Sequence, residues 1–245
     1  MPTFFVGSED VTPPTIRIAG PLLQHLRASL RLQPGDELLV TDPQGRRHRS
    51  EITAVSAKAI ESRILETSTA PPRTSPRLIL YQALLKGEKM DWVIQKATEL
   101  GIDQIVPVHA AHSVVKMQRD RMDHQLTRWQ RIALEAAQQS ERWTLSAIEA
   151  PVDLAKIHQT SADAVRIILS ERSQGATLSS LELPTGAQKA IALLVGPEGG
   201  WEKEELRLAL VQGWQAVSLG SRILRAETAA IAAISVIQSR LGELG

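Results

Sequence analysis

The sequence predicts a chain of two parts, a small β-barrel followed by an α/β domain whose mainly parallel sheet is covered by helices. Three observations carry this prediction. Turn signals separate short β-leaning segments over residues 1–70, three prolines between residues 71 and 76 interrupt helix and strand, and strands then alternate with helices. We place the boundary at residue 72, with residues 1–72 as the first domain and residues 73–245 as the second.

Short strands are expected in the first domain over residues 37–41, 49–55 and 59–65, with one helix over residues 21–30. Barrels of this size commonly bind oligonucleotides, although a fold alone is a weak argument for a function. Arg46 and Arg47 open a basic cluster, RRHR, beside an expected hairpin tip. The cluster could bind RNA phosphates, and a solvated hairpin end is the alternative.

The second domain contains at least five expected strands, over residues 77–83, 104–108, 165–170, 191–195 and 215–219. Helices are expected between and after them, over residues 88–100, 120–140 and 226–241, with another that begins at residue 201. In open parallel sheets, ligands bind at the carboxyl ends of strands, where loops enter helices. We therefore expect a ligand site in the loops that follow the last strands.

Composition excludes several classes of function. The chain has 245 residues, 43% of them hydrophobic, and a net charge of +1, so binding of nucleic acid would depend on local basic patches. It contains no cysteine, which excludes disulfides, thiolate metal sites and a cysteine nucleophile. The six histidines lack ligand spacing, so we expect no metal. Because the longest apolar runs are far shorter than the roughly twenty residues of a membrane helix, we expect a cytoplasmic protein.

Two glycine-containing turns lie close together in the sequence. Residues 193–201 read LLVGPEGGW and residues 219–228 read LGSRILRAET, and each segment runs from an apolar strand through a turn into a helix. Neither a dinucleotide-binding G-x-G-x-x-G nor a P-loop is present. The glycines of residues 196–200 leave the backbone bare, so a flat ring could approach it directly. A tight strand-to-helix turn without a ligand is the alternative.

Both segments closely resemble the signature segments of the ribosomal RNA small subunit methyltransferase E family. Further matches are KGEKM over residues 86–90, QKATELG over residues 95–101 and EAAQQS over residues 135–140. The resemblance implies a SPOUT-type α/β-knot methyltransferase domain with a deep trefoil knot, preceded by a PUA-like β-barrel that docks RNA. The chain departs from the family pattern at His112, where an arginine is usual, at Glu141, where a glycine is usual, and near Ser146, where a proline is common.

The resemblance also implies a reaction and its participants. S-adenosylmethionine would be used to methylate N3 of a uridine in the decoding region of 16S ribosomal RNA, within the 30S subunit, by a homodimer that pairs through its C-terminal domains. The implied cofactor residues are Leu194, Val195, Gly196, Pro197, Gly199, Gly200, Leu219, Gly220, Ile223, Leu224 and Thr228. Lys86, Lys89 and Arg142 would face RNA, together with Arg46 and Arg47 of the basic cluster.

The chemistry of uridine suggests catalytic residues. N3 becomes a good nucleophile only when its proton leaves and negative charge spreads onto O2 and O4, which a guanidinium is shaped to hold. We therefore expect Arg225 to stabilise the uridine anion, with Glu198 or Glu227 as base or orienting group. A helix-capping or arginine-pairing role for either glutamate is the alternative.

The absence of cysteine limits which atoms of the RNA could accept a methyl group. Carbon 5 of a pyrimidine is a poor nucleophile unless a thiolate first adds to the ring, so a chain without cysteine should methylate nitrogen or oxygen. Two other functions remain open at this point, another SPOUT specificity such as 2′-O-methylation of transfer RNA, and a non-catalytic RNA-binding protein.

Overall fold

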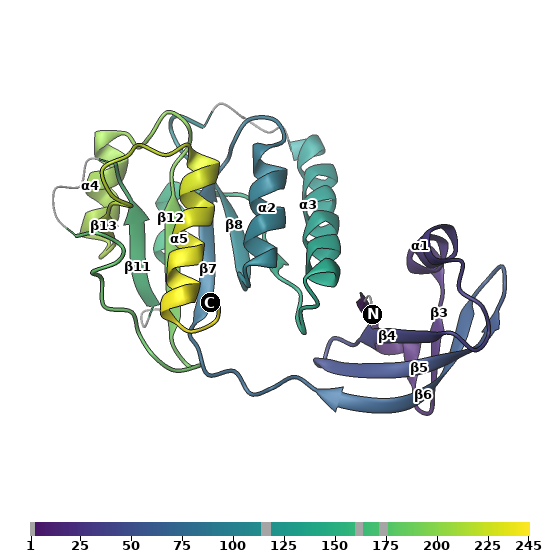
Figure 1. Ribbon diagram of the computed structural model, residues 1–245. Coiled ribbons are helices and arrows are strands. Elements are labelled where there is room, and N and C mark those ends of the chain that lie inside the picture. The colour runs from purple at the N-terminus through teal and green to yellow at the C-terminus, as the bar shows by residue number, and fades with distance from the viewer. Residues whose placement is uncertain (1–2, 114–118, 160–163, 172–175) are drawn as a thin grey trace. The chain divides into compact units, whose positions relative to one another are not determined.

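A computed structural model describes residues 3–113, 119–159, 164–171 and 176–245 (Figure 1). The chain forms two compact units. The first comprises Met1–Pro72 together with Ala137–Leu145, and the second comprises Arg73–Ala136 and Ser146–Gly245. The short segment at residues 137–145 thus groups with the first unit although the rest of its neighbourhood in sequence does not.

The first unit is built on a six-stranded sheet with the strand order β1-β4-β5-β6-β3-β2. Its strands are β1 (Thr3–Phe5), β2 (Val11–Thr12), β3 (Thr15–Ile18), β4 (Glu37–Thr41), β5 (Arg46–Val55) and β6 (Ile60–Thr69). Neighbouring strands are antiparallel except β1 and β4. Helix α1 (Gly20–Leu30) contributes Leu23 and Leu26 to a core with Ile16, Val40 and Ile60. Strand β5 begins at Arg46, directly after the turn at residues 42–45 that joins it to β4, so the basic cluster lies in a strand beside a hairpin tip, as predicted.

The second unit contains a seven-stranded sheet in which every strand pair is parallel, as the alternating pattern predicts. Its order is β10-β8-β7-β12-β11-β13, with β9 beside β8. The strands are β7 (Arg77–Ala83), β8 (Gln104–His109), β9 (Ala147–Ile148), β10 (Val152–Asp153), β11 (Ala164–Leu169), β12 (Ala190–Val195) and β13 (Gln215–Val217). The five predicted strands are therefore present, and the two short strands β9 and β10 add to them.

Helices cover both faces of this sheet (Figure 1). Helices α2 (Lys89–Glu99), α3 (Arg119–Gln139) and α5 (Ala226–Arg240) pack on one face, where Met90, Trp129 and Ile234 are almost fully buried. Helix α4 (Lys203–Val211) and the short helix η2 (Leu154–Gln159) pack on the other. Because both faces are covered, the central strands read as continuous apolar runs in the sequence.

Strand β12 shows how the two faces divide one apolar run. Leu193 and Val195 pack toward α2 and α5, whereas Ala192 and Leu194 pack toward α4, because successive side chains of a strand point to opposite faces. The loops after β11, β12 and β13 leave the sheet at its carboxyl edge. None of the helices that the structure describes is long and apolar enough to cross a membrane.

Candidate cofactor and active site

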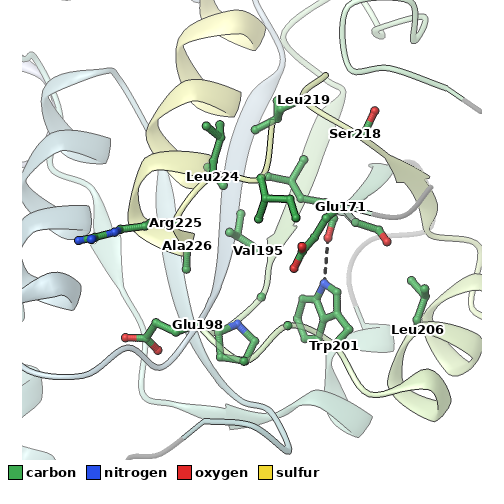
Figure 2. Close-up of a pocket in the computed structure, with 18 of the residues that line it drawn as sticks. Glu171, Val195, Glu198, Trp201, Leu206, Ser218, Leu219, Leu224, Arg225 and Ala226 are labelled. Carbon is green, nitrogen blue, oxygen red and sulfur yellow. Dashed lines mark hydrogen bonds between the residues drawn. The ribbon is translucent and has the colours of Figure 1, made fainter. Parts of the chain in front are cut away.

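A cavity of about 580 Å³ opens at the carboxyl ends of β11, β12 and β13 (Figure 2). It is lined by Lys89 of α2 and by residues drawn from three segments, namely 169–171 after β11, 195–206 from β12 into α4, and 217–229 from β13 into α5. Its volume lies within the roughly 300–1,000 Å³ that is typical of small-molecule sites. The two glycine turns of the sequence therefore form facing parts of one cavity.

The first turn, residues 196–200, is held closely by its surroundings. The Gly200 amide donates to the Pro197 carbonyl over 3.0 Å, and Gly200 has a φ of +72°, which favours glycine. The Trp201 indole packs under the turn, so that a Cβ on Gly196 would lie 3.0 Å from a ring carbon of Trp201. The indole Nε1 donates to the Leu169 carbonyl over 2.9 Å, a bond that Figure 2 shows as a dashed line.

The second turn, residues 219–225, carries apolar side chains and two arginines. Leu219, Leu224 and Ala226 give the cavity an apolar wall, while Ile223 is 78% exposed. Gly220 has a φ of +114°, a conformation that an L-residue adopts only with strain. Helix α5 begins directly after Arg225, and its small residues Ala226 and Ala230 allow the helix to pack close to the sheet.

A carboxylate and a lysine meet beside the first turn. Glu198 Oε1 accepts from the Lys89 Nζ over 3.0 Å and from the Lys86 amide over 3.2 Å. Burial raises the pKa of Glu198, but the hydrogen bonds from Lys89 and from backbone amides outweigh it, so this pKa lies below its ordinary value of 4.5. Glu227 Oε2 lies 3.9 Å from the same Nζ. Lys89 is thus close to two carboxylates.

Glu227 and Glu198 differ in how their carboxylates are satisfied. Glu227 Oε2 is buried and accepts no hydrogen bond from the residues that the structure describes. Glu198 accepts several and is held ionised. An acceptor without a donor has free capacity to take a proton or a hydrogen bond.

Arg225 extends from the second turn on the same side of the cavity as Glu198, away from Glu171 and Ser218 (Figure 2). Its side chain is exposed and makes no hydrogen bond or ion pair with another described residue. A guanidinium placed in this way is available for an anionic group that enters from solution.

Most of the predicted cofactor residues come together at the cavity. Those that line it are Val195, Gly196, Pro197, Gly199, Gly200, Leu219, Gly220, Ile223 and Leu224, and the predicted catalytic residues Glu198 and Arg225 line it as well. Leu194 does not, because strand alternation buries its side chain on the α4 face. Thr228 and Glu227 are not part of the lining, although Glu227 lies 3.9 Å from the lining residue Lys89.

Sequence reasoning missed several cavity residues, among them Glu171 and Trp201. Glu171 follows β11 and places Oε1 3.4 Å from the position that a Cβ on Gly200 would take. Trp201 lines the cavity from the first turn. The position of Trp201 directly after the glycines was visible in the sequence, whereas Glu171 follows a strand without any glycine turn to mark it.

The predicted RNA-binding residues fall into two groups. In the second unit, Lys86 is exposed and Lys89 lines the cavity. In the first unit, the Arg46 Nε pairs with Asp42 Oδ2 at 2.7 Å, with 45% of the Arg46 side chain exposed. Arg47 donates to the carbonyls of Glu141 and Arg142 over 3.0 and 3.1 Å, and its guanidinium lies 3.8 Å from the centre of the Trp143 ring. The arginine cluster is thus largely engaged within its own unit.

The three departures from the family pattern each have a structural setting. Glu141 has a φ of +51°, the left-handed conformation that a glycine would adopt without strain. The buried Ser146 donates from Oγ to the Ile102 carbonyl over 2.7 Å. His112 contacts the first turn through the carbonyls of Gly199 and Gly200. Within the described part of the chain, no group of three or more acidic or histidine side chains could hold a metal ion.

Comparisons with known proteins agree with this geometry. A family model described as an RNA methyltransferase domain matches residues 72–238, and one described as an RNA methyltransferase PUA domain matches residues 18–65. The chain is 32% identical to ribosomal RNA small subunit methyltransferase E of a Synechocystis strain, covering 96% of this chain and 77% of that protein. The Bacillus subtilis protein of the same name is 30% identical, covering 91% of this chain and 90% of that protein.

Solved structures give the same result. A Neisseria gonorrhoeae ribosomal RNA small subunit methyltransferase E bound to S-adenosylmethionine matches with a TM-score of 0.88 and 31% identity, over 98% of each chain. A Legionella pneumophila methyltransferase solved with the same cofactor matches with a TM-score of 0.88 and 29% identity, over 97% of each chain. The fold and site thus define an RNA methyltransferase with a PUA-like first domain, which confirms the predicted class. The chain belongs to the ribosomal RNA small subunit methyltransferase E family.

Proposed function

We propose that this chain is an S-adenosylmethionine-dependent ribosomal RNA methyltransferase whose cavity between the two glycine turns holds the cofactor. The observation that carries this proposal is the cavity itself, because it combines a suitable volume, an apolar wall and bare glycine backbone at the carboxyl edge of a parallel sheet. The Neisseria gonorrhoeae protein of this family has been solved with S-adenosylmethionine bound, as has the similar Legionella pneumophila methyltransferase.

The residues present fit this cofactor. We infer that the first turn binds it through Val195 and the backbone of residues 196–200, and the second through Leu219, Gly220, Ile223 and Leu224. S-adenosylmethionine, when bound, supplies an activated methyl group from its sulfonium. The resemblance of residues 221–229 to the family signature further supports a SPOUT-type trefoil knot at this site.

We infer that the methyl acceptor is N3 of a uridine in the decoding region of 16S ribosomal RNA, presented by the 30S subunit. Negative charge spreads onto O2 and O4 when the N3 proton leaves, and the Arg225 guanidinium is free to hold these oxygens. Glu198 and Glu227 flank Lys89 beside it. Because Glu198 has a lowered pKa and accepts hydrogen bonds from Lys86 and Lys89, we assign it the orienting role and Glu227 the role of base.

The remaining predicted partners extend this proposal. Lys86 and Lys89 are placed to meet RNA phosphates beside the cavity, and Arg46, Arg47 and Arg142 would add basic charge from the first unit. A homodimer through the second unit would cover Ile223, which is 78% exposed. With the 30S subunit as substrate, the protein would work in the cytoplasm.

Product mapping tests this function. Undermethylated 30S subunits are incubated with the protein and labelled S-adenosylmethionine, the RNA is digested, and the nucleosides are separated by mass spectrometry. We expect label in 3-methyluridine, at a rate about a hundred- to a thousandfold lower with the Arg225→Ala protein. Label in a 2′-O-methylated ribose would contradict the N3 assignment, and the absence of label from any RNA would contradict the methyltransferase function.

A further inference from the structure

A short loop after β8, residues 110–113, contacts the first glycine turn without lining the cavity. His112 Nδ1 lies 3.2 Å from the Gly199 carbonyl oxygen and 3.1 Å from the Gly200 carbonyl oxygen. Both carbonyls belong to the stretch whose other atoms face the cavity. The imidazole therefore contacts the first turn at its last two residues, just before the chain enters α4.

The chemistry of these contacts fixes the proton on His112. Carbonyl oxygens can only accept hydrogen bonds, so Nδ1 must carry the hydrogen that both of them share. The other ring nitrogen, Nε2, lies 3.6 Å from a carboxylate oxygen of Glu202. His112 thus donates to the turn both as the neutral Nδ1–H tautomer and as the imidazolium, because both forms carry a hydrogen on Nδ1.

A close approach makes the contact possible. A Cβ placed on Gly199 would lie 2.8 Å from the His112 Cβ and 3.3 Å from its Cγ, distances that do not leave room for a methyl group. Glycine at this position is therefore explained by the histidine that packs against it. A second hydrogen bond holds the loop, because the Ala111 amide donates to Glu205 Oε1 over 2.8 Å. The other oxygen of Glu205 accepts from the Glu202 amide at the start of α4.

We propose that His112 is a positioning residue that holds the first glycine turn in its cofactor-binding shape through the hydrogen bond from Nδ1 to the Gly199 and Gly200 carbonyls. The proposal rests on the proposed function, since it assigns the turn to the cofactor. His112 touches neither the cavity nor Arg225, so it acts through the turn.

Titration calorimetry with S-adenosylmethionine tests the proposal on four full-length proteins, the wild type, His112→Ala, His112→Asn and His112→Gln. The alanine variant should bind about three- to tenfold more weakly, the effect of one partly exposed hydrogen bond. The asparagine variant should recover most of this loss, because its amide nitrogen can take the place of Nδ1. The glutamine variant should not, because its amide reaches toward the place of Nε2.

Two further readouts separate positioning from folding and from the proposed function. In steady-state methylation, KM for the cofactor should rise in His112→Ala while kcat stays within about twofold, since Arg225 is untouched. In the cofactor-free protein, hydrogen exchange at the Gly200 amide, which closes the turn, should be faster in His112→Ala and His112→Gln than in the wild type.

The outcomes are distinct. If the wild type binds no cofactor, the proposed function fails, and exchange at Gly200 still tests the contact. Unchanged affinity and unchanged exchange in His112→Ala would overturn the inference. Equal recovery by asparagine and glutamine would also overturn it, because packing and not the Nδ1 donor would then hold the turn. Should His112→Ala fail to fold, the comparison of the asparagine and glutamine variants decides.

Discussion

The two turns that form the cavity are held in very different ways. The first turn, residues 196–200, is braced by the Trp201 indole, by His112, and by Lys86 and Lys89 through Glu198. The second turn, residues 219–225, makes no side-chain hydrogen bond or ion pair with any other residue that the structure describes. Its Gly220 has no neighbouring atom within 4 Å of where a Cβ would be.

This difference suggests that one turn determines cofactor affinity and the other the rate of methyl transfer. A wall that is fixed before binding costs little conformational entropy when the cofactor arrives, so the first turn should supply most of the cofactor affinity. The second turn ends at Arg225, whose unpaired guanidinium we propose as the contact for the acceptor base, so this turn should govern the rate of methyl transfer. Substitutions in the two turns should therefore separate affinity from rate.

The largest effect is expected at Arg225. In Arg225→Ala, kcat should fall about a hundred- to a thousandfold, the usual cost of removing a group that stabilises developing negative charge. The Kd for S-adenosylmethionine should change less than about threefold. Single-turnover methylation and calorimetry measure the two quantities. Arg207→Ala, which removes an exposed arginine of α4 outside the cavity, is the matched control and should behave as the wild type.

Equal losses of rate and cofactor affinity in Arg225→Ala would break the division between the turns. The guanidinium would then be part of the structure of the second turn and not a contact for the acceptor.

The next effect is expected at Gly196. In Gly196→Ala the new Cβ would lie 3.0 Å from the Trp201 ring, and overpacking of about 1–3 kcal/mol corresponds to a roughly five- to hundredfold weaker Kd for the cofactor. Gly213→Ala is the control, because it strains a glycine of φ +84° at the end of α4, outside the cavity lining. It should lower the melting temperature and leave the Kd unchanged. A Kd for Gly196→Ala equal to that of the wild type would show that the first wall is not rigid.

A smaller pair of effects compares one side chain from each turn. Trp201→Phe removes the donor to the Leu169 carbonyl and should weaken cofactor binding roughly two- to tenfold. Ser221→Ala removes a hydroxyl group from an exposed position in the second turn and should change the Kd less than about twofold. Calorimetry on both variants measures the contrast. A larger loss in Ser221→Ala than in Trp201→Phe would reverse the comparison.

The smallest effect is a pH dependence of the contacts that Glu198 makes with Lys86 and Lys89. Because its pKa is lowered below 4.5 in the folded chain, ionised Glu198 adds stability that is present above that pH and is lost as pH falls through the folded pKa. Glu198→Gln should therefore lose stability at neutral pH and show a shallower fall in the free energy of unfolding below about pH 4.5. Urea denaturation at neutral pH and near pH 3 measures both slopes. If the free energy of unfolding depends on pH equally in the two proteins, the ionised Glu198 does not stabilise the first turn.

Much of the fold could be predicted from the sequence, because the apolar runs, the proline linker and the glycine turns act locally. Strands β4 and β7 occur at the predicted residues, and α5 begins at the predicted Ala226. The sequence could not assign Leu194 to the right face, because a strand buried on both sides has no polar alternation to mark which residues face the cavity.

The missing parts of the site depend on contacts between distant residues. Arg47 reads as part of a phosphate-binding cluster, yet its partners at Glu141 and Arg142 lie 94 and 95 residues away in sequence. Glu171 reaches the cavity only because β11 lies beside β12 and β13 in the sheet. His112 similarly reaches the first turn across 87 residues of sequence. No local pattern encodes such pairings, so they required the structure.

The central claim is that the two turns form a cofactor site whose affinity and rate are carried by different walls. Calorimetric titration of the folded full-length chain with S-adenosylmethionine, run side by side for the wild type, Gly196→Ala and Arg225→Ala, tests it most directly. We expect one cofactor bound per chain in the wild type, nearly unchanged binding in Arg225→Ala, and binding weakened at least about fivefold in Gly196→Ala. Absence of binding to the folded wild type, or loss of binding in Arg225→Ala with none in Gly196→Ala, would contradict it.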